Sequence, residues 1–237
     1  MNKTVKIILE AVLIIVAIGL GIMLYMSISK PMKFDNEYTK RGVACAEKLK
    51  AIRTLEEAYK QTYHVYCGNF DTLINRLLNE DSLRITTKVV YRDRFPQDSN
   101  FVLEEISELE AIKKGYIARK DTLVNPIKQL LENKKLQIRD VKADTMRNMT
   151  IDEIRNLRYL PYPEGTKEEF DIQAGIMEKD YGKIPLVEVK VGIDRLMSDC
   201  DEQMVINKLD ELKTKNNKYN GWGFGSMQDA IIDGNFE

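Results

Sequence analysis

The sequence has little of what most enzyme and metal sites require. Its 237 residues contain one histidine, three cysteines and no C-x-x-C pair, so the ligand spacing of a zinc site is absent. It also lacks a Walker phosphate loop, a serine nucleophile elbow, an H-E-x-x-H motif and a dinucleotide-binding glycine motif. We therefore expect no catalytic residues and no bound cofactor, which points to a protein that is not an enzyme.

The few reactive side chains have ordinary structural explanations. Cys45, Cys67 and Cys200 allow one disulfide and leave an odd thiol, but packed thiols are the simpler expectation. His64 stands between aromatic residues, where packing or capping explains it better than a role as a base. Spacing singles out no carboxylate pair among 37 acidic residues, so a membrane-tethered enzyme or sensor domain stays open as an alternative.

The strongest positive feature is an uncharged apolar run of 19 residues from Ala11 to Ser29. A helix of that length spans about 28 Å, close to the hydrocarbon thickness of a bilayer. The run is longer than the apolar core of a typical cleaved signal peptide. We predict that residues 1–30 are a retained single-pass anchor with the lipid bilayer as partner.

Basic residues gather just beyond this run. Between Lys30 and Arg53 seven basic residues stand against three acidic ones, as in a segment beside anionic headgroups. No nucleic-acid motif accompanies them, so we expect no nucleic-acid partner. Lys3 and Lys6 balance the positive charge on the far side of the run, so a cytoplasm-facing scaffold remains a second alternative.

Residues 31–80 are predicted to form a stem. Apolar positions at helical spacing predict an amphipathic helix over 43–63, followed by a short leucine-rich helix. Pro31 is expected to interrupt the chain just past the anchor, because its ring disfavours a continuous helix. The apolar positions of the stem helix are Cys45, Leu49, Ile52, Leu55 and Tyr59.

Two segments of this region resemble the N-terminal stem of type IV pilins and type II secretion pseudopilins. The run Lys6-Ile7-Ile8-Leu9-Glu10-Ala11 is similar to the start of the mature family chain, with Glu10 as the acidic fifth residue. Leu49 to Tyr59, with the Gly68-Asn69-Phe70 segment after it, looks like the junction of stem and head. The residue before Lys6 is Val5, where the family's peptidase cuts after glycine.

The resemblance covers residues 6–78 and implies a function. It implies a single-pass inner-membrane protein with a periplasmic body, a non-catalytic structural component of a bacterial envelope assembly. It also implies homo- or hetero-oligomers with other envelope proteins, in which Glu10 pairs with a neighbour's terminal amine or a lysine. The residues expected to pack between subunits are Leu49, Ile52, Leu55 and Tyr59.

The same family binds calcium near the end of its head. Here Asp199, Asp201 and Glu202 form the densest acidic group and are the corresponding calcium candidates. The EF-hand pattern fails, because no glycine stands at the required place. An acidic helix N-terminus, favourable to the helix dipole, is the role we prefer for them.

Residues 81–237 are predicted to form an α+β body with an antiparallel sheet and flanking helices. Two alternating apolar runs on either side of a glycine-containing turn predict a β-hairpin near 168–193. The glycine- and aromatic-rich tail suits a closing strand on the same sheet. The remaining predictions are a strand over 83–91, helices over 101–118, 127–133 and 204–215, and a break at Asn125-Pro126.

Overall fold

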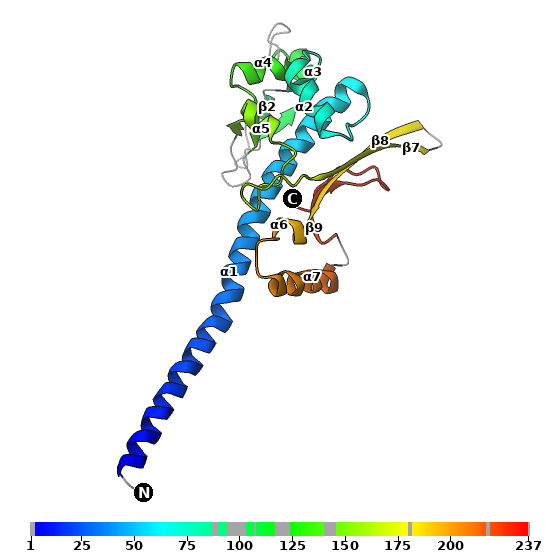
Figure 1. Cartoon of the computed structure of the whole chain (residues 1–237). Helices are drawn as coiled ribbons and strands as arrows, with labels where there is room; N and C mark the ends of the chain where they lie inside the picture. Colours follow the sequence, from blue (N-terminus) through cyan, green and yellow to red (C-terminus); the bar gives the residue numbers. More distant parts are fainter. Residues whose placement is uncertain are drawn as a thin grey trace.

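One long helix dominates the molecule. The computed structural model describes residues 3–86, 90–93, 103–106, 108–116, 124–139, 146–179, 182–216 and 219–236. Helix α1 runs from Lys3 to Tyr63, and its 61 residues extend over about 90 Å. Figure 1 shows the first half of α1 standing free and the second half packed against the body.

Between Val12 and Ser29 the free half of α1 is apolar on every side. Large side chains from Val12 to Met32 are exposed, and none of them packs against the body. A helix that is apolar all round needs an apolar environment. Among the described residues this one helix is long and apolar enough to cross a membrane.

The interruption expected at Pro31 is wrong, because α1 continues through it. A proline inside a helix removes one N–H group, here the one that would bond to the carbonyl of Ser27. Pro31 lies on the exposed part of the helix, where no neighbouring element restricts its ring. The apolar segment and the stem therefore form one continuous rod.

The body has the α+β architecture predicted from the sequence. Its core sheet is antiparallel with the strand order β7-β8-β9, and three two-stranded pairs, β1-β4, β2-β3 and β5-β6, lie outside it. The strands are β1 (Arg84–Thr86), β2 (Val90–Asp93), β3 (Leu103–Ile106), β4 (Val124–Pro126), β5 (Gln137–Arg139), β6 (Met146–Asn148), β7 (Asp171–Lys179), β8 (Gly182–Gly192) and β9 (Gly221–Gly225). The helices after α1 are α2 (Phe70–Asn79), α3 (Glu108–Lys113), α4 (Ile127–Glu132), α5 (Ile151–Arg155), α6 (Ile193–Leu196) and α7 (Glu202–Asn216).

The hairpin near 168–193 is confirmed. Ile172 pairs with Val189 and Ala174 with Val187, so these residues share one face of the sheet. Phe224 of the glycine-rich strand β9 lies opposite Val189, which makes β9 the closing strand expected from the tail. The expected helices over 127–133 and 204–215 correspond to α4 and α7.

The single helix expected over 101–118 is wrong. Leu103–Ile106 is strand β3, paired with β2, and of the described residues in this range only Glu108–Lys113 are helical. Charge pairs at helical spacing suggested the helix, but cross-strand pairing outweighs such weak pairs. Of the strand expected over 83–91, residues 84–86 and 90–91 are strand, and 87–89 lie outside the described residues.

Two apolar clusters hold the body on α1. The larger one joins the buried face of α1 between Cys45 and Tyr59 to α2, α4, α5 and the sheet. The smaller one joins Phe34 of α1 to Ile193, Met197 and Val205. In Figure 1 the element α7 lies at the end of the body closest to the free half of α1.

Candidate functional site

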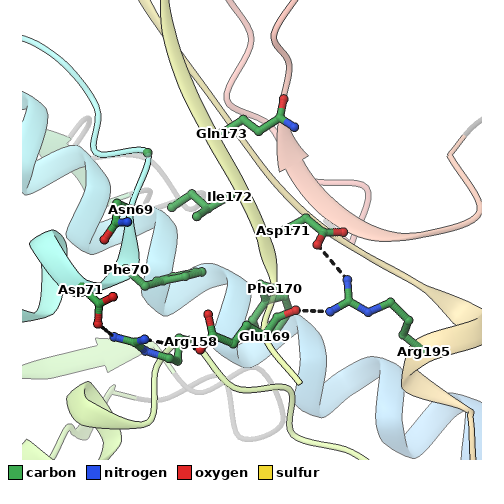
Figure 2. Close-up of a pocket in the computed structure, with 11 residues that line it drawn as sticks. Asn69, Phe70, Asp71, Arg158, Glu169, Phe170, Asp171, Ile172, Gln173 and Arg195 are labelled. Atoms are coloured by element: carbon green, nitrogen blue, oxygen red, sulfur yellow. Dashed lines mark hydrogen bonds and ion pairs between the residues drawn. The ribbon is translucent and has the colours of Figure 1, made fainter. Parts of the chain in front are cut away.

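A cleft of about 430 Å³ lies between the start of α2 and the outer edge of β7. Figure 2 shows Asn69, Phe70 and Asp71 on one side of it and the β7 strand on the other. Asn69 caps α2, because its side chain accepts a hydrogen bond from the N–H of Thr72. The cap fixes the position at which the α2 wall of the cleft begins.

The opposite wall is a strand edge without a strand neighbour along the cleft. β7 ends the β7-β8-β9 order, so one of its edges is free of named strands in the described part of the chain. Before β7, the N–H of Phe170 bonds to the carbonyl of Arg158 at 2.9 Å. Further along, Gly68 approaches so closely that a Cβ there would lie 3.1 Å from the nitrogen of Ala174. The edge is therefore open between these two contacts, at residues 171–173.

Two arginines and their carboxylate partners frame the cleft. Arg158 pairs with Asp71 of α2 and with Glu169, at 3.4 Å in the second pair, and so links the two walls. Arg195 of α6 pairs with Asp171 at 2.8 Å. Hydrogen bonding to Asp71 raises the pKa of Arg158, so the guanidinium group stays positively charged. These pairs make the frame rigid and strongly polar.

Further contacts of Arg195 complete this frame. It pairs with Glu168 at 3.2 Å and also donates to the carbonyl of Glu169. The floor, in contrast, is apolar, because Phe70 and Phe170 are buried and Ile172 points toward them in Figure 2. An apolar floor under a polar rim is typical of a binding site.

A buried carboxyl stands behind the α2 wall. Glu56 of α1 is fully buried, and its Oε2 accepts the N–H of Cys67 at 2.8 Å. Its Oε1 has no hydrogen-bond partner among the described residues. Burial raises the pKa of Glu56 to about 8, although the Cys67 N–H acts in the opposite direction. Glu56 thus holds the turn that leads into the cleft at Gly68 and Asn69.

The residues expected to mediate assembly lie in two different environments. Glu10 is exposed on the free half of α1. The side chains of Leu49, Ile52, Leu55 and Tyr59 are buried in the main apolar cluster, against the chain's own body. Over residues 43–63 only Glu57 and Gln61 are exposed, and the assembly role of the four residues stays a prediction.

The calcium site considered at Asp199, Asp201 and Glu202 does not form in this arrangement. Both carboxylate oxygens of Asp199 bond to Arg41, and this contact lowers the pKa of Asp199. Asp201 accepts the N–H of Met204 at 3.3 Å and so caps the start of α7. No group of three or more metal-ligating side chains occurs among the described residues.

The other singled-out residues have structural positions. His64 follows the last residue of α1 with a φ of 61°, and its N–H bonds to the carbonyl of Lys60. This left-handed geometry is typical of a helix C-terminus. All three cysteines are free thiols, and Cys45 and Cys67 are buried. None of the cleft-lining residues in the described chain is a serine, cysteine, histidine or lysine.

Sequence reasoning did not identify the residues that shape the cleft. Asp71, Arg158 and Arg195 lie far apart in the sequence, and the fold alone brings them together. The sequence did contain a signal for the unusual position of Glu56, because its carboxylate falls on the apolar side of an amphipathic helix.

Compared with known proteins, the chain matches no family model, no curated protein and no solved structure.

Proposed function

We propose that this chain is a single-pass membrane-anchored, non-catalytic component of an envelope assembly. In this proposal Ala11–Ser29 crosses the inner membrane, the body lies on the periplasmic side, and the body binds other envelope proteins. The pilin-like N-terminal sequence motivates the choice of assembly. The lining of the cleft supports binding better than covalent catalysis, because its carboxylates are held in ion pairs with the guanidinium groups and its described residues include no serine, cysteine, histidine or lysine.

The observation that carries the proposal is the continuity of α1. The same helix is exposed and apolar at Val12–Ser29 and buried in the body at Cys45–Tyr59, with no linker between them. A tethered enzyme needs only a flexible connection to its anchor, as a linker provides. A rigid connection transmits position and orientation from the membrane to the body, which suits a structural component.

The proposal is tested first by topology. Cells that make the full chain are converted to spheroplasts and treated with protease. We expect the body to be digested and a membrane-protected N-terminal fragment to remain. A body that resists protease in intact spheroplasts and is digested after lysis contradicts the periplasmic placement and favours the cytoplasm-facing scaffold.

The second test separates assembly from insertion. The variant Glu10→Ala should stay in the membrane fraction after carbonate washing but lose most of the cross-linked oligomers, because a carboxylate inside an apolar helix needs a partner. Glu10→Asp, which keeps the charge, is the matched control and should retain oligomers. Equal cross-linking of all three proteins would remove the assembly role of Glu10.

A further inference from the structure

The open edge of β7 is the feature of the cleft that points to a class of partner. Residues 171–173 lie between the Arg158 contact and the Gly68 contact, and they line the cleft together with the start of α2. At about 3.3 Å per residue, this gap is about 10 Å long. An extended segment placed there would add a short strand to the sheet, its backbone groups pairing with those of β7.

The charges of the cleft select the side chains of such a segment. Three carboxylates and two guanidinium groups line it, so the lining carries an excess of negative charge. Both arginines are paired with these carboxylates, but the side chains of Asp71 and Asp171 remain 76% and 52% exposed and can each accept a further cationic partner. A lysine or arginine is therefore the complementary charged residue for the rim.

The same charges argue against a second copy of this chain at the open edge. A symmetric pair formed by two β7 edges would place each acidic rim beside the other. Like charges directly opposite each other destabilise a strand pair. The occupant is thus expected to be a different chain.

We propose that an extended segment of a partner protein, with a lysine or arginine at its centre, binds along residues 171–173 of β7 as an added strand. The apolar floor formed by Phe70, Phe170 and Ile172 would receive a neighbouring apolar side chain of this segment. The inference rests on the proposed function, because the partner is taken to be another component of the assembly.

The test uses the full chain in lipid nanodiscs and short fluorescein-labelled peptides. The first peptide alternates threonine and valine around a central lysine, the second has glutamate at the centre, and the third keeps the lysine but carries prolines that remove backbone donors. We expect the lysine peptide to bind about tenfold more tightly than the glutamate peptide. The proline peptide should bind weakly, because added strands depend on main-chain hydrogen bonds.

Two matched variants of the chain locate the site. Gln173→Lys adds a positive charge at an exposed position of the open edge and should weaken binding of the lysine peptide about tenfold. Gln203→Lys makes the same change on exposed α7 and should leave binding unchanged. Because both positions are exposed, unaltered circular dichroism is expected for both variants.

Each outcome bears on the inference separately from the proposed function. Equal binding of the lysine and glutamate peptides, equal binding of the proline peptide, or equal effects of the two variants would overturn it. The oligomers lost in Glu10→Ala are measured without peptide, so they can persist or vanish independently of this result. Failure of the peptide test alone rejects the added strand and leaves the membrane-anchored assembly component in place.

Discussion

Adjacent residues of the same type can have very different environments in this protein, as Glu56 and Glu57 show. The adjacent Glu57 is exposed, whereas Glu56 is buried with one oxygen on the Cys67 N–H and the other without a partner. A carboxylate in such a site loses its hydration, so the neutral form is favoured and the pKa rises to about 8. Between pH 4.5, the ordinary pKa of a glutamate, and about pH 8, the Glu56 carboxyl is thus protonated in the folded protein and ionised in the unfolded chain.

This difference predicts how stability depends on pH. Because the folded-state pKa is the higher one, the contribution of Glu56 to the free energy of unfolding is greatest below pH 4.5, falls as the pH rises toward about 8, and then levels off. Each unit of pKa difference is worth about 1.4 kcal/mol, so the fall amounts to a few kcal/mol. Glu56→Gln cannot ionise and should remove this fall, so that the variant exceeds the natural protein in stability above pH 8.

Urea unfolding of the full chain in detergent micelles at several pH values checks this prediction, with Trp222 as the single tryptophan probe. The compared quantity is the change in the free energy of unfolding with pH. The absolute free energy is not compared, because an amide at position 56 also changes the hydrogen bonds of the site. Glu57→Gln, next to it but exposed, is the control and should keep the natural slope. Parallel curves for Glu56→Gln and the natural protein would show that folding does not shift the pKa of Glu56.

At the scale of the elements, α1 and β9 are in close contact at Gly42 and Trp222. Gly42 of α1 faces the ring of Trp222 in β9, and a Cβ at Gly42 would lie 2.8 Å from the ring. Tyr38, one turn earlier, packs on the same ring with a centroid distance of 5.1 Å. The Trp222 ring of β9 can thus lie directly against the backbone of α1, because Gly42 has no side chain there.

Filling that space should destabilise the fold. Gly42→Val replaces a poor helix former but forces the Trp222 ring away, and overpacking of this kind costs about 1–3 kcal/mol. We expect a lower melting temperature by circular dichroism. In a Trp222→Leu background the same valine should cost much less, which a double-mutant cycle measures. An equal loss in both backgrounds would place the strain elsewhere.

Periodicity predicted elements whose two sides differ. The stem part of α1 is buried from Cys45 to Tyr59 but exposes Glu57, β7 begins with alternating exposed and half-buried residues, and α7 buries Val205 but exposes Ile206, so their patterns were readable. Residues 103–113 have charges at helical spacing but form β3 and α3, because strand pairing depends on a partner that local sequence does not contain. The cleft was missed for the same reason, since Arg158 and Asp71 meet only in the folded chain.

At the scale of the whole molecule, the body lies close to the end of the apolar segment. Phe34, five residues after Ser29, shares an apolar cluster with Val205 of α7, and the next residue, Asp35, pairs with Lys208 of α7 at 3.8 Å. At about 1.5 Å per residue this places α7 within about 9 Å of Ser29 along the helix axis. Arg41 strengthens this attachment through Asp199 and through the carbonyl of Leu196 at 3.0 Å. Figure 1 shows α7 crossing below the body on the side of the free helix. If the apolar segment spans the bilayer, α7 faces the headgroups and the β7–β8 hairpin lies farther away.

Headgroup proximity therefore should differ between two labelled sites on one molecule. Ile206 on α7 is 43% exposed, and Lys183 lies at the exposed end of the hairpin. Each is changed to cysteine in a Cys200→Ser background, labelled with a fluorophore and reconstituted with lipids that carry a headgroup quencher. We expect strong quenching at position 206 and weak quenching at position 183, because α1 holds the body at a fixed height. Equal quenching would mean that the body moves freely on its anchor. The continuity of α1 would then no longer favour a structural component over a tethered enzyme.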